Sequence, residues 1–401
     1  MSFIARHLDP KLRAAASQYP VVTITGPRQS GKTTLVRAIF PEREYVSLEL
    51  PEQREFALTD PRGFLGQFSG PAIIDEAQRV PSLFSYVQVL VDESPQAGLF
   101  ILTGSQNFLL LNQVTQSLAG RSSILHLLPV SRPELAGQDM MDVSKLGGPA
   151  IPAPGTSKGF LETLHTGGYP RIHDRHLDPQ DWLRNYYQSY IERDVRQVLN
   201  VGDLDAFGRF IGLCAGRVGQ LLDLTSLGND CGIAHSTARR WLSVLETSFI
   251  VKLLQPHHRN FNKRLIKSPK LYFLDTGLLC YLLRIRAPDD LAWHASRGAV
   301  FESWVVSEAV KNYTHRGLRP DVYFWRDAAG HEIDLLLDAG AGALVPVEAK
   351  SGQTFHPDFV KELHWWQQTA GLSGAAGAVV YGGDLSTQYK NHTVLSWRSW
   401  G

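Results

Sequence analysis

An eight-residue run near the start of the chain has the residue types and spacing of a phosphate-binding loop. Residues 26–33 fit the pattern G-x-x-x-x-G-K-[ST] and follow an apolar run typical of a strand. The glycines let backbone N–H groups surround a β-phosphate at the positive end of the next helix. Lys32 would bridge the β- and γ-phosphates, and the Thr33 hydroxyl would bind Mg²⁺. We therefore predict binding of ATP and Mg²⁺ by Gly26, Pro27, Arg28, Gln29, Ser30, Gly31, Lys32, Thr33 and Thr34.

Two carboxylates follow where a nucleotide hydrolase needs them. A buried apolar run ends in Asp75 and Glu76. Asp75 would hold the magnesium through water, and Glu76 would polarise the attacking water. A helix N-cap would explain the pair equally well on its own, but its place after the loop favours hydrolysis. The next apolar run leads to Ser105, our choice as the side chain that senses the γ-phosphate, with Thr103 as the second choice.

Near the C-terminus, two carboxylates and a lysine are predicted to meet on a β-hairpin. If the hairpin is centred on Ala341, Asp334 and Glu348 face each other, with Cβ atoms only about 5 Å apart. Such a pair repels unless a positive charge lies between its members, and a divalent cation would supply that charge. Lys350 projects from the same face as Glu348 and could steady an attacking water. Alternatively, the carboxylates form salt bridges with Lys350.

Positive charge is concentrated in the middle of a chain whose net charge is only +1, with 40 Lys and Arg against 39 Asp and Glu. Residues 252–270 include six Lys and Arg and no acidic residue, and two arginines lie on the helix predicted just before them. A basic hairpin beside a helix–turn–helix is suited to a DNA phosphate backbone. Protein contacts with a solvated basic loop are the alternative. The candidate DNA-binding residues are Arg239, Arg240, Arg259, Lys263, Arg264 and Lys267.

These residues need an α/β chain of several domains to position them. Residues 1–135 alternate short apolar runs with helical segments, which indicates a parallel sheet. We expect a linker and helical lid at 136–205, and at 206–285 a winged helix with helices at 221–227 and 236–246, the second capped by Ser236. In the segment 286–401, predicted strands again alternate with predicted helices, as in an α/β domain. Strands are predicted at 21–25, 45–48, 72–74, 99–102, 250–254, 270–274, 322–325, 332–337, 344–349 and 376–381.

The composition excludes several classes of protein. With 401 residues, 43% hydrophobic and 20% charged, the chain is expected to fold throughout. Three dispersed cysteines do not make a disulfide framework. No run is long and apolar enough for a membrane span, and the start does not resemble a signal peptide. We therefore expect a cytoplasmic protein that does not contact a membrane.

The motifs resemble predicted AAA+ ATPases of bacteria and archaea that carry a C-terminal domain of unknown function, DUF4143. The resemblance covers nearly the whole chain and rests on residues 26–35, 73–78, 102–105, 117–121, 127–131, 167–170 and 190–194. It implies an AAA+ P-loop domain in which an arginine from a neighbouring subunit completes the site. Arg121 matches that position, and a surface role is the alternative; Arg28 could contact phosphate instead. An arginine supplied in this way implies a homo-oligomer, a ring such as a hexamer.

The C-terminal pattern Asp-x₁₃-Glu-x-Lys resembles the PD-(D/E)XK nuclease core, which also occurs in Holliday-junction resolvases. This resemblance implies a restriction-endonuclease-like α/β fold and adds Glu302, on a preceding helix, to Asp334 and Glu348 as metal ligands, with Lys350 beside them. Together with the predicted ATPase site, it implies ATP hydrolysis coupled to binding and remodelling of branched DNA, with metal-dependent cleavage as an added activity. The alternative is a nucleotide-switched regulator of a protein partner, in which the nuclease-like domain is inert.

Overall fold

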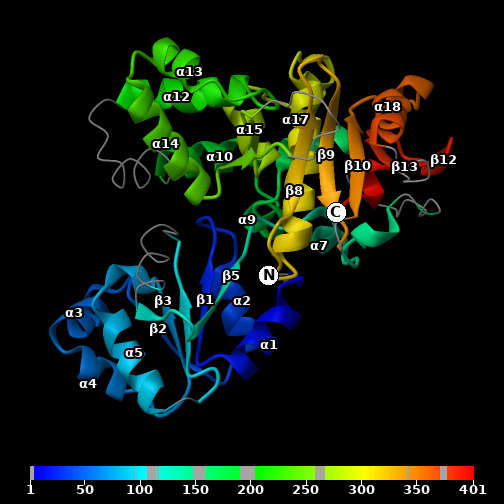
Figure 1. The fold of residues 1–401 in the computed structure, drawn as a ribbon. Helices are drawn as coiled ribbons and strands as arrows, with labels where there is room; N and C mark the ends of the chain where they lie inside the picture. Colours follow the sequence, from blue (N-terminus) through cyan, green and yellow to red (C-terminus); the bar gives the residue numbers. More distant parts are fainter. Residues whose placement is uncertain are drawn as a thin grey trace. The chain divides into compact units, whose positions relative to one another are not determined.

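The computed structural model describes residues 4–94, 96–105, 114, 117–146, 148, 159–189, 204–257, 267–340, 343–370 and 377–401. The chain forms two compact units (Figure 1). Unit 1 contains residues 1–130, 247–249 and 314–319, and unit 2 contains the rest. Apart from residues 247–249 and 314–319, the predicted middle and C-terminal segments therefore lie within one unit. Among the described residues, no helix combines the length and the hydrophobicity that crossing a membrane requires.

Unit 1 is built on a parallel five-stranded sheet in the order β2-β3-β4-β1-β5. Strands β1, β3 and β4 are buried at every residue, as expected for a parallel sheet covered on both faces. Because all strands run the same way, their carboxyl ends lie along one edge. The elements are α1 (Asp9–Gln18), β1 (Val21–Thr25), α2 (Lys32–Ile39), β2 (Glu44–Ser47), α3 (Pro51–Thr59), α4 (Pro61–Gly66), β3 (Ala72–Asp75), α5 (Leu83–Glu93), β4 (Phe100–Thr103) and β5 (Ser122–His126).

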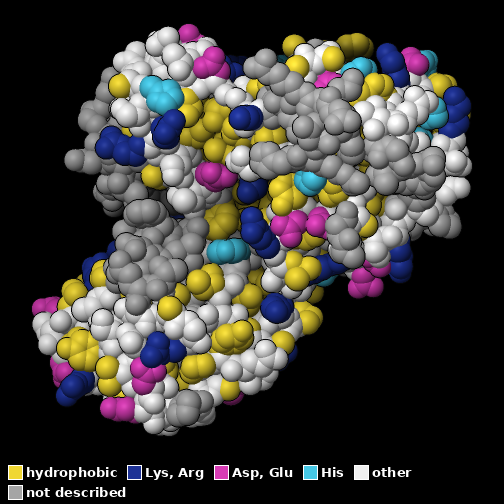
Figure 2. Space-filling model, in the orientation of Figure 1, with side chains coloured by type: hydrophobic (Ala, Val, Ile, Leu, Met, Phe, Trp, Pro, Cys, Tyr) yellow, Lys and Arg dark blue, Asp and Glu magenta, His cyan; other side chains and the backbone are white. Residues whose placement is uncertain are grey.

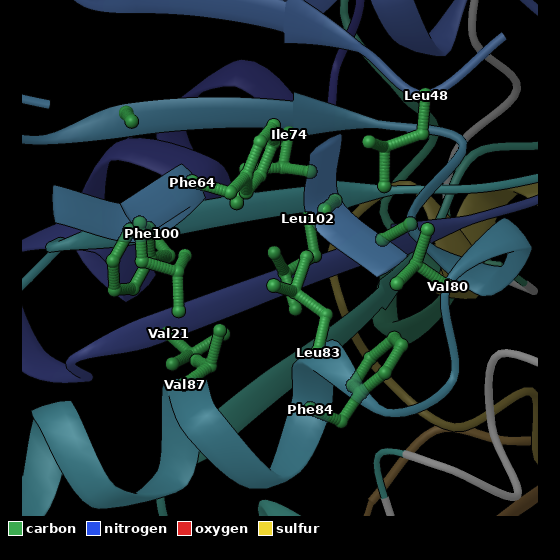
Figure 3. Close-up of a cluster of buried hydrophobic side chains, with 14 of the residues drawn as sticks. Val21, Leu48, Phe64, Ile74, Val80, Leu83, Phe84, Val87, Phe100 and Leu102 are labelled. Carbon is green, nitrogen blue, oxygen red and sulfur yellow. The ribbon is translucent and has the colours of Figure 1, made fainter. Parts of the chain in front are cut away.

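Successive strand residues of unit 1 enter two different cores. Ile74 and Leu102 pack with Phe84 and Val87 of α5 on one face of the sheet (Figure 3). Ile73 belongs to the second core, together with side chains of α1 and α2. This alternation has the period of two that an extended strand imposes. The two cores, one on each face of the sheet, hold the strands in place. They thereby fix the positions of the residues that follow the carboxyl ends of the strands.

The middle of the chain forms helices followed by a two-stranded antiparallel sheet of β6 and β7. The helix–turn–helix is present, but two of its predicted details are wrong. The first helix starts later than predicted because the side chain of Asp223 caps it, accepting the backbone N–H of Ser226 at 2.9 Å. The second begins at His235, so Ser236 lies in its first turn and is not the cap. The elements are α7 (Arg132–Ala136), α8 (Phe160–Thr166), α9 (Pro170–Arg175), α10 (Pro179–Tyr186), α12 (Leu204–Gly216), α13 (Leu224–Cys231), α14 (His235–Thr247), β6 (Val251–Leu254), β7 (Lys270–Phe273), α15 (Thr276–Leu282) and α16 (Pro288–Trp293).

The last part of unit 2 is a six-stranded mixed sheet in the order β12-β13-β11-β10-β9-β8. A helix, three antiparallel strands, a second helix and a strand parallel to β10 follow one another. The four strands lie where they are predicted, but the sequence indicated only the pairing of β9 with β10. Trp325 and Trp366 pack in its core. The final hairpin of β12 and β13 was not predicted. The elements are α17 (Arg297–Thr314), β8 (Val322–Arg326), β9 (Glu332–Asp338), β10 (Leu344–Lys350), α18 (Lys361–Ala370), β11 (Ala378–Tyr381), β12 (Thr387–Tyr389) and β13 (His392–Ser396).

Candidate nucleotide site and carboxylate cluster

The predicted phosphate loop connects the carboxyl end of β1 to the first residue of α2. Two of its backbone positions require glycine. Gly26 has φ +149°, and a Cβ there would lie 2.1 Å from the carbonyl oxygen of Leu127. Gly31, with φ +94°, is in the left-handed region immediately before the helix. The loop therefore has the tight turn that exposes backbone N–H groups at a helix N-terminus.

Lys32 lies buried inside this loop. Its Nζ donates hydrogen bonds to the carbonyl oxygens of Gly26 at 3.0 Å and Pro27 at 2.8 Å. Burial lowers the pKa of Lys32 to about 8, although the charges of Glu76 and Asp75 oppose the shift. Its partners are neutral oxygens that phosphate oxygens can replace, so the loop fits the phosphates of a nucleotide. The hydroxyl of Ser30 is also buried and has no hydrogen-bond partner among the described residues.

Asp75, the last residue of β3, collects three hydroxyl groups. Its carboxylate accepts a hydrogen bond from Thr33 Oγ1 at 3.0 Å, one from the Tyr45 hydroxyl at 2.9 Å and one from Thr103. Burial and the adjacent charge of Asp75 raise the pKa of Tyr45 to about 12, so its hydroxyl remains a donor. Thr33 and Asp75 are the residues that would hold the magnesium of a bound nucleotide, and they are in contact. Tyr45 was not among the predicted site residues.

Glu76 is held by two further side chains. Its Oε2 accepts hydrogen bonds from Gln78 Nε2 at 2.5 Å and Ser105 Oγ at 3.1 Å. Its backbone has φ 56°, a left-handed conformation that costs a non-glycine residue about 1–3 kcal/mol. Ser105, predicted as a phosphate sensor, thus lies beside Glu76. Gln78 was missed, although it stands in the 73–78 run that matches the family.

Arg6 supports the loop from outside. Its guanidinium donates to the carbonyl oxygens of Ser30 at 2.8 Å and Leu128 at 2.7 Å. It thereby joins the phosphate loop to the segment after β5. No motif surrounds Arg6 in the sequence, and its partners are 24 and 122 residues away, so no local signal could have identified it.

Arg121 lies away from the phosphate loop of its own chain. It directly precedes β5, and Ser122 pairs with Val21, the first residue of β1. Arg121 is therefore at the amino edge of the sheet, whereas the loop follows the carboxyl edge. Its guanidinium forms a two-pronged ion pair with Asp92, at 2.5 and 2.8 Å. Arg28, in contrast, is half-buried within the loop itself.

The candidate DNA-binding residues divide into three groups. Arg239 and Arg240 are exposed on α14, and Lys267 is exposed just before β7; within the part of the chain that the structure describes, none of the three has an ion-pair partner. Arg259, Lys263 and Arg264 lie outside the described residues. On the face shown in Figure 2, basic and acidic side chains are interspersed rather than gathered into one large field. The interpretation of residues 252–270 as a surface hairpin is wrong for Lys270, which is buried.

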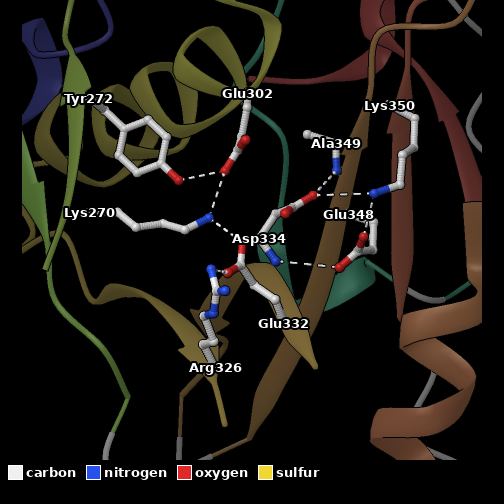
Figure 4. Close-up of polar contacts among 9 residues, drawn as sticks. All are labelled: Lys270, Tyr272, Glu302, Arg326, Glu332, Asp334, Glu348, Ala349 and Lys350. Carbon is white, nitrogen blue, oxygen red and sulfur yellow. Dashed lines mark hydrogen bonds and ion pairs between the residues drawn. The ribbon is translucent and has the colours of Figure 1, made fainter. Parts of the chain in front are cut away.

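The predicted pair of carboxylates does meet in unit 2 (Figure 4). The register of β9 and β10 runs from Leu344 opposite Asp338 to Val347 opposite Leu335, so the next pair is Asp334 and Glu348. The Asp334 side chain accepts the backbone N–H of Ala349 at 2.9 Å. Burial, then the charge of Asp334, raises the pKa of Glu348 to about 8. Lys350 Nζ lies 2.6 Å from Glu348 and 3.5 Å from Asp334.

A second lysine joins this cluster from β7. Lys270 Nζ donates to Glu302 Oε1 at 3.1 Å and pairs with Glu332. Tyr272, also on β7, donates to the same oxygen of Glu302 at 2.5 Å, and Arg326 pairs with Glu332 at 2.9 Å. Burial, followed by the charge of Asp334, raises the pKa of Glu302 to about 7. The cluster thus contains four carboxylates and three basic side chains.

A divalent ion does not fit the cluster in this arrangement. Oxygens of Glu302, Glu332 and Asp334 lie within 4.8 Å of one another, a spacing that one ion could bridge. The Lys270 ammonium, however, contacts two of these three carboxylates. The structure therefore brings together Glu302, Asp334, Glu348 and Lys350 as predicted, but adds a cation that the sequence did not reveal.

Comparisons with known proteins identify the family. Three family models match consecutive parts of the chain: an AAA domain at residues 18–136, a domain of unknown function called DUF8612 at 157–289, and DUF4143 at 297–400. The uncharacterized proteins Rv2008c of Mycobacterium tuberculosis and Mb2031c of Mycobacterium bovis are each 32% identical to the chain over 335 residues, which cover 83% of this chain and 71% of theirs. The chain belongs to the AAA–DUF4143 ATPase family.

Solved structures similar to this AAA–DUF4143 ATPase are more distant. The Walker-type ATPase PABY2304 of Pyrococcus abyssi is 16% identical, with a TM-score of 0.42 over 70% of this chain and 96% of that one. The RuvB Holliday junction branch migration motor of Thermotoga maritima is 20% identical, with a TM-score of 0.29 over 61% and 88% of the two chains. These scores are too low to transfer an activity to the AAA–DUF4143 ATPase.

The burial of Lys32 predicts that binding of Mg-ATP depends on pH. The phosphates favour the charged form of Lys32, so binding raises its pKa from about 8. At pH 7 the side chain is already protonated, whereas at pH 9 binding must take up a proton. We expect affinity to fall between pH 7 and 9, by at most about tenfold per pH unit. Calorimetry in two buffers that differ in ionisation enthalpy would measure both affinity and proton uptake.

The control for this measurement is Lys32→Arg, whose side chain stays charged throughout the range. Any affinity that this variant retains should not fall with pH. A flat affinity of the wild type between pH 7 and 9, without proton uptake, would contradict the buried, readily deprotonated state of Lys32.

Proposed function

We propose that this chain hydrolyses ATP with the help of Mg²⁺ and couples hydrolysis to binding and remodelling of DNA. The observation that carries the first part is the contact between the Thr33 hydroxyl and the Asp75 carboxylate at 3.0 Å, with Glu76 as the next residue. A magnesium ion and a hydrolytic carboxylate need this set of groups. When bound, Mg-ATP would supply the phosphoanhydride bond that is broken. Lys32 would hold the phosphates, and Thr33 and Asp75 the metal.

Glu76 is positioned to accept the proton of an attacking water. Gln78 and Ser105 both hold its Oε2, and Oε1 has no hydrogen-bond partner among the described residues. A carboxylate fixed by one oxygen presents the other in a defined direction, which favours proton transfer by a positioned base. Ser105 would thus act through Glu76, in addition to the phosphate contact expected of it.

Coupling to DNA is supported by the exposed arginines of α14. Arg239 and Arg240 lie on the second helix of the helix–turn–helix, and the predicted basic residues Arg259, Lys263, Arg264 and Lys267 follow in the chain. Unpaired surface arginines bind phosphates without first losing an ion pair. The resemblance of the C-terminal segment to junction-resolving nucleases favours branched DNA as the ligand.

A second candidate function is a nucleotide-switched regulator that acts on a protein partner. The pairing of Lys270 and Lys350 with the C-terminal carboxylates favours it, because metal-dependent cleavage needs these carboxylates as ligands. ATPase activity that no DNA changes would favour the regulator. Stimulation by duplex or four-way-junction DNA would favour the DNA-coupled enzyme.

Replacement of the catalytic carboxylate tests the ATPase. We expect Glu76→Gln to lower kcat for ATP hydrolysis by about 10²–10⁴-fold, since the amide cannot accept the proton of water. Binding of Mg-ATP should be retained, because Lys32, Thr33 and Asp75 are unchanged. Glu93→Gln, an exposed glutamate of α5, is the matched control and should hydrolyse ATP normally. Normal turnover by Glu76→Gln would remove Glu76 from the mechanism.

Charge reversal on α14 tests the coupling to DNA. We expect Arg239→Glu/Arg240→Glu to weaken DNA binding and to lower the slope of log affinity against log salt by about two, one for each lost phosphate contact. Fluorescence anisotropy at several salt concentrations would measure this slope. Arg54→Glu/Arg62→Glu makes the same charge change on α3 and α4 of unit 1 and should leave the slope unchanged. Equal effects of both double variants would speak against a DNA surface on α14.

Subunit mixing tests the proposed oligomer. If Arg121 completes the site of a neighbouring subunit, Arg121→Ala and Lys32→Ala proteins should each be inactive, yet regain part of the ATPase activity when mixed. Each mixed pair then contains one intact site. The ion pair with Asp92 would have to open for this role, so Asp92→Asn should leave the activity in place. Absence of recovery at every mixing ratio would contradict a shared site.

A further inference from the structure

Lys270 reaches the C-terminal carboxylate cluster from another part of the chain. It is the first residue of β7, which belongs to the region matched by DUF8612, whereas Glu302 and Glu332 belong to the DUF4143 region. Its side chain is only 3% exposed. Lys270 therefore adds a buried positive charge to a site whose other charged members all come from a later segment.

The position of this ammonium group is fixed from several sides. The backbone of Lys270 pairs with Leu254 of β6 and forms a bridge to Leu221. Its Nζ also lies 5.6 Å from the centre of the Phe324 ring, a distance suited to a cation–π contact. A lysine anchored at its backbone and stem delivers its charge to one place, between Glu302 and Glu332 (Figure 4).

We infer that the Lys270 ammonium takes the place of a divalent cation in the C-terminal cluster, so that the protein neutralises this site with its own side chain. Three carboxylates converge within the span of one ion, and the group in contact with two of them is a lysine. Lys350 contacts the other two carboxylates of the cluster, those of Asp334 and Glu348. A divalent ion can enter only if Lys270 leaves, because two positive centres at such separations repel strongly in a buried site.

This inference goes beyond the proposed function and does not depend on ATP hydrolysis. It concerns metal binding by unit 2, and it gives β7 a second role as the carrier of the blocking charge. Cleavage of DNA by this cluster would require a movement of β7 or of the Lys270 side chain. Without that movement, the carboxylates of the nuclease-like core remain paired with basic side chains.

Binding of Mn²⁺ without nucleotide tests the inference. We expect calorimetry of the wild type to detect no Mn²⁺ site that depends on Asp334. Wild type and Asp334→Asn should therefore bind the same number of Mn²⁺ ions. Lys270→Met should gain one site with a dissociation constant of about 10⁻⁴–10⁻³ M, the weak end of the range for carboxylate sites that bind Ca²⁺. The double variant Lys270→Met/Asp334→Asn should lose it again. The dependence on Asp334 separates this site from any Mn²⁺ bound in unit 1.

Lys311→Met is the matched control. Lys311 is also a buried lysine of unit 2 and pairs with Glu308 at 2.8 Å. Among the described residues, Glu308 does not belong to a group of three acidic side chains close enough to share one ion. The loss of Lys311 should therefore not create a metal site. If Lys311→Met gains an equal site, then the loss of any buried lysine frees carboxylates for a metal ion. That result would overturn the specific role of Lys270.

Two further results would also overturn the inference. One is a Mn²⁺ site in the wild type that Asp334→Asn abolishes, because metal and Lys270 would then coexist. The other is a folded Lys270→Met protein, by near-ultraviolet circular dichroism, that gains no site. If that variant does not fold, Lys270→Met/Glu332→Gln keeps the balance of charge and leaves Glu302 and Asp334 as ligands. Gain of an Asp334-dependent site there supports the inference, and no gain overturns it.

Discussion

A charge removed from water needs a partner, and the placement of partners decides what each unit of this protein can bind. Lys32, Asp75, Lys270 and Glu348 are all buried, and each is held by hydrogen bonds or opposite charges. The protein provides these partners by bringing strand ends together. In unit 1 the parallel sheet gathers the carboxyl ends of β1, β3 and β4. In unit 2 the hairpin of β9 and β10 places Asp334 opposite Glu348, and β7 adds its lysine.

Local pattern accounts for what the sequence could predict. The phosphate loop is a contiguous motif, and its glycines are required by backbone angles, so its residues could be named without a structure. The register of the C-terminal hairpin followed from its turn, because opposed residues are equally distant from the centre. The strands that were predicted lie within about two residues of their observed bounds, the usual uncertainty of element boundaries, whereas β5, β12 and β13 were not predicted. The errors at the helix–turn–helix are local: Asp223 caps the first helix and sets its start, and the second helix begins one residue before Ser236.

Contacts between distant residues account for what the sequence could not predict. Arg6 reaches Leu128 across 122 residues, and Lys270 reaches Glu332 across 62. No feature of the sequence around either residue indicates its distant partner, so from the sequence each would be interpreted as a surface charge. Lys270 shows the consequence most clearly, because it stands in a strongly basic run. Its neighbours in the sequence suggested a DNA contact, whereas its position in the fold makes it a counter-ion.

The two buried lysines differ in the kind of partner that holds them, and this difference separates the two sites. Lys32 is held by the carbonyl oxygens of Gly26 and Pro27, which are dipoles without net charge. Phosphate oxygens are stronger partners for an ammonium group than carbonyls, so an anionic ligand can displace them. Lys270 is held by carboxylates. A cation that binds these carboxylates must first displace the ammonium group that is paired with them. Unit 1 therefore presents a site that is ready for an anion, whereas unit 2 presents one that is closed to a cation until β7 or its lysine moves.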